Sequence, residues 1–299
     1  MDPAFLLLKS AAYGVSLLPL SLAQGFGAAL GRLGLALVGD RGGAARENLR
    51  LSFPEKDPAW VKATAREAFA NLGRAAMECC RLVRVGPDEV SRLCPPVGVE
   101  NMTNALAKGR GVLMLTGHLG NWEMCGIACS RQVGPIMVVG RPLDFAPADR
   151  LVNSFRQRGG NQVVPKARSF RPLLRRLRQG GLVGILGDQN VDWYDGVWVD
   201  FFGRPACTNK GMALLSMASG APVVPVHNFR MKNGRFQTIY GPEIPPAESG
   251  DKTQDIWDNT QAYTKAIEDM IRRDPAQWLW AHKRWKTKPQ QPWPREKDS

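Results

Sequence analysis

Residues 111–123 read Gly111-Val-Leu-Met-Leu-Thr-Gly-His-Leu-Gly-Asn-Trp-Glu123, and the rest of the chain is organised around this stretch. Its apolar run, Val112 to Leu115, has the length of a buried parallel strand, and the Thr-Gly pair after it favours a turn. Asn121 is a suitable helix N-cap, which places Glu123 in the first turn of the next helix. The stretch therefore predicts a strand, a loop that carries His118, and a helix.

This arrangement brings a base and a carboxylate together. A carboxylate that holds one ring nitrogen of His118 leaves the other free to take a proton from a substrate hydroxyl, and Glu123 is the acid expected to do so. The amides of Leu119, Gly120 and Asn121 lie at the helix start, where they are expected to face a developing oxyanion, and Gly120 permits close approach of a ligand. The alternative is a histidine that only packs.

A metal site is not expected in this chain. The helical His-Glu-x-x-His pattern of zinc hydrolases is absent, and the histidines are His118, His227 and His282.

The sequence from His118 to Glu123 resembles the His-x4-acid motif of the glycerolipid acyltransferase superfamily. Its Asn-Trp-Glu ending is similar to the lipid A late acyltransferase branch, the lauroyl and myristoyl transferases. The resemblance implies transfer of a fatty acyl chain from an acyl carrier protein thioester to a hydroxyl of a lipid A precursor. It also implies His118 as general base, no cofactor, and a location at the bacterial inner membrane with the catalytic domain on the cytoplasmic side.

The composition describes an ordered α/β protein with excess positive charge. Hydrophobic residues make up 44% of the 299 residues, which excludes a disordered or fibrous chain, and the formal net charge is +13. Such an excess is typical of proteins that meet phosphates, anionic lipid or an acidic partner. The basic residues are not interleaved with aromatic residues in a groove-binding motif, so a nucleic-acid partner is not expected.

The N-terminal region is the candidate membrane segment. Residues 10–31 carry no charged side chain and, at about 1.5 Å per residue, reach roughly the 30 Å of a hydrocarbon core, although Pro19 interrupts the run. We expect an anchor that either spans at a tilt or bends at Pro19 and lies in one leaflet; a buried helical hairpin is the alternative. The predicted division is a membrane-anchoring segment, residues 1–40, and a catalytic domain, residues 41–299.

The remaining periodicity predicts an α/β fold with a mixed, largely parallel central sheet flanked by helices. Apolar runs at 136–139 and 181–187 predict further buried strands, and residues 235–240 predict a hairpin strand. Helical spacing predicts helices over 44–53, 60–82, 101–108 and 253–273.

Three residues at predicted strand ends are further site candidates. Arg141 is expected beside the histidine's strand, where it would bind a substrate phosphate or carboxylate or stabilise the thioester oxyanion. Asp188 is either a polar group of the site or a turn cap, and the resemblance favours the site because that branch has a similar pair, here Asp188-Gln189. Ten basic residues lie between Arg141 and Arg178 against two acids, and they are expected to attract the acidic carrier.

Two later stretches also match the resemblance. Glycine and proline around Phe202, Gly203 and Arg204 predict a fixed loop beside the site. The alternation of tryptophan and cation over residues 277–286 suggests an interfacial anchor or an anion-binding strip, and it is similar to the C-terminal motif of the lipid A branch. His227 lies inside a predicted strand and is expected to be a core residue.

Other functions stay open from the sequence. An acyltransferase for another glycolipid or a lysophospholipid would share every catalytic residue. A noncatalytic, basic membrane-surface protein is the alternative from a different class. A thioesterase or an acyl-cysteine mechanism at Cys125 is less favoured, because no Gly-x-Ser-x-Gly motif is present and Cys125 and Cys129 have the spacing of packed helix residues.

Overall fold

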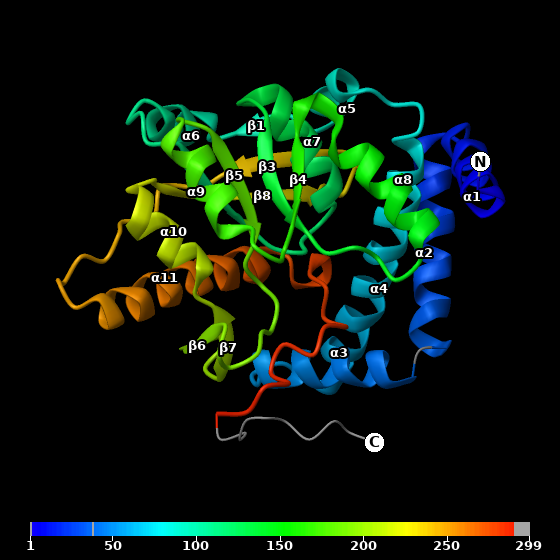
Figure 1. Cartoon of the computed structure of the whole chain (residues 1–299). Coiled ribbons are helices and arrows are strands. Elements are labelled where there is room, and N and C mark those ends of the chain that lie inside the picture. The colour runs from blue at the N-terminus through cyan, green and yellow to red at the C-terminus, as the bar shows by residue number, and fades with distance from the viewer. Residues whose placement is uncertain (1, 38, 290–299) are drawn as a thin grey trace.

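A seven-stranded sheet forms the centre of the structure, a computed structural model that describes residues 2–37 and 39–289 (Figure 1). The strand order is β1-β9-β8-β2-β5-β3-β4, and all neighbours are parallel except β8 and β9. The mixed, largely parallel sheet is therefore confirmed, as is the hairpin strand. The strands are β1 Pro96–Val97, β2 Val112–Thr116, β3 Ile136–Gly140, β4 Gln162–Pro165, β5 Leu182–Leu186, β8 Val223–Arg230 and β9 Phe236–Tyr240, with a separate antiparallel pair of β6 Gly196–Asp200 and β7 Pro205–Asn209.

Helices flank this sheet, and those expected from helical spacing are present with shifted ends. Asp57 begins α4 by accepting a hydrogen bond from the Trp60 backbone N–H at 2.7 Å, so the long helix starts where its capping residue lies. The helices are α1 Pro3–Ser16, α2 Leu20–Leu37, α3 Gly39–Ser52, α4 Pro58–Arg81, α5 Pro87–Leu93, α6 Val99–Leu106, α7 Trp122–Gln132, α8 Ala146–Arg156, α9 Phe170–Arg178, α10 Gly211–Ser219 and α11 Lys252–Arg273, with short 3-10 turns at Arg158–Gly160 and Pro275–Gln277.

The register of β2 against β5 decides which residues meet at the edge of the sheet. These parallel strands run side by side with Thr116 opposite Leu186. The residues two positions further along each chain are His118 and Asp188, so both emerge at the same edge. Strand β5 also lies between β2 and β3. The expectation that Arg141, after β3, ends a strand next to that of His118 is therefore wrong.

The N-terminal segment forms two helices that pack on the rest of the protein (Figure 1). Helix α1 contacts α4 and α8, and Phe5 lies under the Arg150 guanidinium at 4.4 Å. Helix α2 follows α4 along its length. It is long and apolar enough to cross a membrane, with a mean hydropathy of 1.2, which alone is weak evidence for an anchor. Pro19 separates the two helices, as expected.

The α2–α4 contact is unusually close because glycines meet there. A Cβ added at Gly27 would lie 2.5 Å from the Gly73 carbonyl oxygen, and one at Gly31 would lie 1.9 Å from the Phe69 carbonyl oxygen. Arg32 of α2 also donates to Glu67 of α4 at 3.0 Å. No side chain larger than hydrogen fits at these positions without separating the two helices, so α2 is built to pack against α4.

Candidate active site

His118 is held by Asp188, which follows the adjacent strand. Asp188 Oδ1 lies 2.9 Å from His118 Nδ1, and Asp188 Oδ2 accepts the His118 backbone N–H at 2.8 Å. The same Oδ2 accepts the Trp278 indole N–H at 2.8 Å, and the carboxylate is 2% exposed. The sequence left Asp188 as a site residue or a cap, and the structure places it directly on the imidazole.

The electrostatics of this pair follow from its burial. Burial opposes a charge on His118, but the attraction of Asp188 and its hydrogen bond outweigh burial, and the pKa of His118 is raised. Burial also works against ionised Asp188, yet His118 and the three hydrogen bonds hold the pKa of this carboxyl well below its usual value. Asp188 is therefore an anion that fixes the proton on Nδ1, and this leaves Nε2 as the basic nitrogen.

His118 also lines a hollow. Gln189 Nε2 lies 3.4 Å from His118 Nε2, and the Trp122 ring packs edge-on against the imidazole with centroids 5.1 Å apart. The hollow has about 320 Å³ of space, including the solvent at its mouth. Its lining comes from α4, the His118 loop and the segment after α11: Ala68, Phe69, Asn71, Leu72, His118, Gly120, Trp122, Gln277, Trp278, Leu279, Trp280 and Ala281.

Glu123 has a different partner from the one predicted. Arg156 of α8 donates to it from Nη2 at 2.6 Å and from Nε at 2.9 Å, and the Trp122 indole N–H donates at 3.1 Å. Hydrogen bonding to Glu123 raises the pKa of Arg156, although burial opposes this. The prediction that Glu123 orients the imidazole is wrong, because that position belongs to Asp188. Glu123 instead fixes a cation beside the site.

The loop between His118 and α7 is fixed by hydrogen bonds and packing within the protein. Asn121 caps α7, as predicted, by accepting the Met124 backbone N–H at 3.1 Å. Gly120 has φ +56°, and a Cβ added there would lie 1.8 Å from the Asn228 carbonyl oxygen. The lack of a side chain at this position therefore allows the loop to pack against β8. The amides of Leu119 and Gly120 donate to the carbonyls of Gly117 and Gln277, at 2.8 and 2.9 Å. The expected oxyanion role is therefore wrong for these two amides.

Arg141 is exposed on the outside of the protein, and its strand is not the neighbour of the strand of His118. Its side chain is 82% exposed, and its ion partner is Asp144 at 3.8 Å. The cation beside the site is Arg156, which the sequence analysis did not single out among ten basic residues. No sequence signal separates Arg156 from its neighbours, since it is selected only by the way α8 packs against α7.

Phe202, Gly203 and Arg204 form a fixed loop, but their contacts are structural. Phe202 is 5% exposed with φ +56°, and its backbone N–H donates to Glu268 at 2.8 Å. The Gly203 N–H donates to Asp200 at 2.9 Å, and Arg204 stacks on the Trp285 ring at 4.3 Å. These contacts link the end of β6 to α11 and to the C-terminal tryptophans.

The tryptophans and Arg284 of the C-terminal strip are buried while Lys283 and Lys286 are exposed, so the expectation that its tryptophans form an interfacial anchor is wrong. Trp278, Trp280 and Arg284 are at most 2% exposed. Arg284 donates to the Cys207 carbonyl at 2.9 Å and to Thr208. Trp278 forms a bridge with Leu119 and donates to Asp188, so this strip builds the wall of the site.

The other reactive side chains do not compete with His118. His227 is a core residue of β8, as predicted, and burial followed by the nearby Arg273 lowers its pKa to about 3. Cys125 is 5% exposed, and its hydrogen bond to Cys129 together with burial raises its thiol pKa well above the ordinary value. A thiolate at Cys125 is thus disfavoured, which argues against the acyl-cysteine alternative.

Comparison with known proteins gives one family. A model of the bacterial lipid A biosynthesis acyltransferases matches residues 5–287. The chain is 28% identical over 280 residues to the lipid A biosynthesis lauroyltransferase of Escherichia coli K12, which covers 91% of this chain and 88% of the relative. It is 27% identical to the palmitoleoyltransferase of the same organism, over 88% of this chain and 84% of the relative. A phosphatidylinositol mannoside acyltransferase of Mycolicibacterium smegmatis is 29% identical, over 74% of this chain and 71% of the relative.

Proposed function

The chain belongs to the bacterial lipid A biosynthesis acyltransferase family, and from this premise we propose that it transfers a fatty acyl chain from an acyl carrier protein thioester to a hydroxyl of a lipid A precursor. The observation that carries the proposal is the His118–Asp188 pair, which lies beside a hollow with largely apolar walls. An acyl acceptor hydroxyl at the mouth of that hollow would meet His118 Nε2.

In the proposed mechanism, His118 acts as the general base. Its Nε2 takes the proton of the acceptor hydroxyl while the alkoxide oxygen attacks the thioester carbonyl carbon. Asp188 keeps the other proton on Nδ1 and stabilises the imidazolium that forms. When the tetrahedral intermediate collapses, the C–S bond breaks, and the imidazolium returns its proton to the leaving thiolate. The products are the new ester and the free carrier thiol.

Two polar groups near His118 are candidates for holding the substrates. The Gln189 amide lies 3.4 Å from His118 Nε2, within reach of an oxygen at the reacting centre. Glu123 holds Arg156 next to Trp122, whose ring packs against the His118 imidazole. We assign Gln189 to the thioester oxygen and Arg156 to an anionic group of the acceptor, the role first predicted for Arg141.

The hollow offers an apolar path for the first part of the acyl chain. Ala68, Phe69 and Leu72 of α4 form one wall, and Leu279 and Ala281 form another. Burial of each CH₂ contributes about 0.8 kcal/mol, so even a short apolar channel favours an acyl chain over a polar ligand.

The acyl carrier protein is proposed to bind at the edge of the sheet where His118 lies. Arg141 follows the end of β3, and Lys166 and Arg168 follow the end of β4, so all three lie at that edge. Arg176 instead donates to the Pro135 carbonyl just before β3, at the opposite edge. The exposed Arg141 is therefore better placed than the end of α9 to attract an acidic carrier toward His118.

The membrane is proposed to contact the outer face of α1 and α2, with α2 lying in one leaflet. Leu22, Phe26, Leu33 and Leu37 are 52 to 74% exposed on α2, opposite the face that packs on α4. If α2 crossed the bilayer in this packing, the charged Arg32–Glu67 pair and α4 would enter the hydrocarbon with it. An in-plane position avoids that cost and keeps the anchoring segment, residues 1–40, on the catalytic domain.

A second candidate acceptor is a mannosylated phosphatidylinositol, because relatives at similar identity are named for it. The test is a competition in which purified protein and acyl-carrier thioester are given both acceptors, and products are identified by mass spectrometry. We expect one added acyl chain on the lipid A precursor. Acylation of the mannoside alone would select the second candidate, and thioester hydrolysis without any acceptor product would contradict the transferase proposal.

A further inference from the structure

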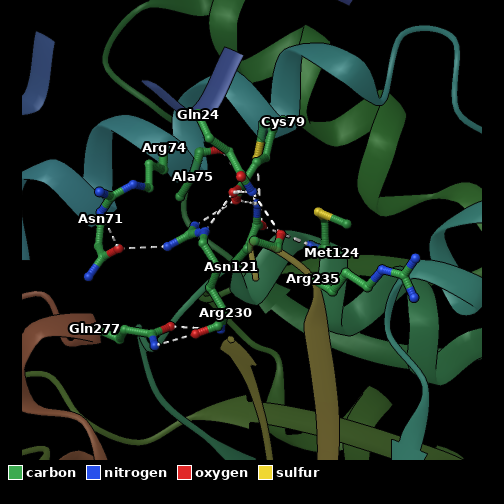
Figure 2. Close-up of polar contacts among 12 residues, drawn as sticks. Gln24, Asn71, Arg74, Ala75, Cys79, Asn121, Met124, Arg230, Arg235 and Gln277 are labelled. Atoms are coloured by element: carbon green, nitrogen blue, oxygen red, sulfur yellow. Dashed lines mark hydrogen bonds and ion pairs between the residues drawn. The ribbon is translucent and has the colours of Figure 1, made fainter. Parts of the chain in front are cut away.

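A buried ion pair lies beneath the His118 loop. Arg230, the last residue of β8, donates to Glu78 of α4 through Nε and Nη2, both at 2.7 Å (Figure 2). The two side chains are 6% and 1% exposed. Burying two charges is costly unless their geometry is good and their other hydrogen-bonding groups are satisfied. This pair meets both conditions, and one of the residues that bond it, Asn121, belongs to the His118 loop.

One connection runs through Asn121, three residues after His118. The Asn121 side-chain N–H donates to Glu78 Oε2 at 2.9 Å, while its oxygen caps α7 through Met124 (Figure 2). Glu78 thus fixes the amide whose oxygen ends the loop and begins the helix. The predicted capping role of Asn121 was correct, but nothing in the sequence indicated the buried carboxylate that orients it.

A second connection runs through Gln277 to the opposite wall of the site. The Gln277 side chain exchanges two hydrogen bonds with the backbone of Arg230, at 2.8 and 2.9 Å (Figure 2). The Gln277 carbonyl accepts the Gly120 N–H at 2.9 Å, and the next residue, Trp278, donates to Asp188. Arg230 therefore reaches both sides of the catalytic pair: its side chain holds Glu78 and, through it, the loop of His118, while its backbone holds the segment of the tryptophan that bonds Asp188.

Two more residues complete the network. Asn71 of α4 accepts from Arg230 Nη1 at 2.8 Å and donates to the Ala276 carbonyl at 2.9 Å. Gln24 of α2 donates to Glu78 Oε1 at 2.9 Å and to the Gly234 carbonyl at 3.0 Å. Asn71 and Gln277 also line the hollow next to His118.

We propose that Glu78 and Arg230 are positioning residues for catalysis, which hold the His118–Asn121 loop and the Trp278 segment at the separation at which Asp188 orients the imidazole. The inference rests on the proposed function. Neither side chain touches the substrates in this account. Their side chains act through Asn121 on the loop and through Asn71, which donates to the Ala276 carbonyl, on the segment before Trp278. A displacement of about 1 Å at a reacting group is enough to lower the rate by about 100-fold.

The test uses the full-length protein with both charges removed, Glu78→Gln with Arg230→Met, so that no unpaired charge stays buried. A matched control is Lys108→Met with Glu243→Gln, which removes an ion pair whose side chains are 51% and 26% exposed. We expect the double variant to lose kcat by about 10- to 100-fold at unchanged KM for the thioester. The control should keep the wild-type kcat.

A second readout does not depend on acyl transfer. In protein labelled with ¹⁵N-histidine, the Nδ1 proton of His118 that is bonded to Asp188 should shift or broaden in the double variant and stay unchanged in the control. Asn121→Ala, which leaves the ion pair but removes its link to the loop together with the α7 cap, should reproduce both effects. If this readout changes while wild-type protein shows no transfer, the proposed function fails and the positioning role stands.

Wild-type kcat and an unchanged His118 signal in both Asn121→Ala and the double variant would overturn the positioning role. A loss of thermal stability with wild-type kcat in the folded fraction would also overturn it, because the network would then be structural only.

Discussion

Replacing Asp188 by Asn separates the mechanism drawn from the structure from the one first drawn from the sequence. Asp188 accepts from the Nδ1 side of His118 with one oxygen, and from the His118 backbone and Trp278 with the other. Asn keeps one oxygen. If that oxygen stays with the backbone and Trp278, the new NH₂ group faces Nδ1, so the ring proton moves to Nε2, the nitrogen that must accept the substrate proton.

The size of the effect follows from what is lost. A hydrogen bond to a charged group contributes about 1.5–3 kcal/mol, which is roughly 10- to 150-fold in rate if it is lost only in the transition state. The wrong tautomer lowers the rate further. The loss can reach the whole contribution of general-base catalysis, which is about 10²- to 10⁴-fold. We therefore expect Asp188→Asn to lower kcat by about 10²- to 10⁴-fold.

The assay measures kcat for acyl transfer from saturating acyl-carrier thioester to the lipid A precursor. The His118→Ala variant gives the rate that remains without the base. Because Asp188 acts through His118, adding Asp188→Asn to His118→Ala should lower kcat little further. Glu123→Gln is the matched comparison, since Glu123 bonds Arg156 and Trp122 in place of the imidazole. In Glu123→Gln, the signal of the hydrogen-bonded Nδ1 proton of His118 should stay visible by NMR. In Asp188→Asn, that signal should disappear. The reverse pattern, or near-normal turnover of Asp188→Asn, would refute the reasoning.

Three further predictions concern pH, the carrier and the membrane. Because the pKa of His118 is raised and the base must be neutral, kcat/KM should fall as pH drops through a value above 6.5, and a flat profile from pH 6 to 8 would exclude His118 as the titrating base. Reversing the charge of Arg141 and Arg168 to Glu should raise KM for the carrier thioester at least several-fold at low salt, whereas Arg175→Glu at the far end of α9 should change it little; equal effects would move the docking site. An N-terminal epitope should be digested by protease in inverted inner-membrane vesicles together with the catalytic domain, and protection of the epitope alone would show that α2 spans the bilayer.

The sequence predicted the parts of the site that depend on local chemistry. An apolar run followed by a turn placed His118 at a strand end, and a suitable capping side chain placed Asn121 at the start of α7. The position of His227 inside a strand predicted a core histidine. These features need only short-range information, because the strand, the turn and the helix cap each follow from a few neighbouring residues.

The partners of the site residues depend on strand order and helix packing, which a single sequence does not contain. Asp188 meets His118 because β5, and not β3, is the neighbour of β2. Glu123 meets Arg156 because α8 packs on α7. The same limit explains Arg141, whose place at a strand end was predicted correctly but whose strand is one position too far from β2.

The C-terminal strip was misjudged for a different reason. Alternating tryptophan and cation is typical of an interface with lipid or anions, because each side chain has an apolar body and a polar end. Here the tryptophan rings pack on the core, with the ring centroids of Trp278 and Phe201 5.7 Å apart, and the polar ends of Trp278 and Arg284 bond inside the protein. Residue types with both characters fit either environment, so only the packing decides between them.

We propose above that His118, held by Asp188, is the base for acylation of a lipid A precursor. Mass spectrometry of lipid A tests this most directly. The host lacks this protein and is supplied with either the wild-type chain or His118→Ala at equal abundance. We expect the wild-type chain to restore one acyl chain on lipid A and His118→Ala to restore none. Restoration of that chain by His118→Ala would contradict the proposal.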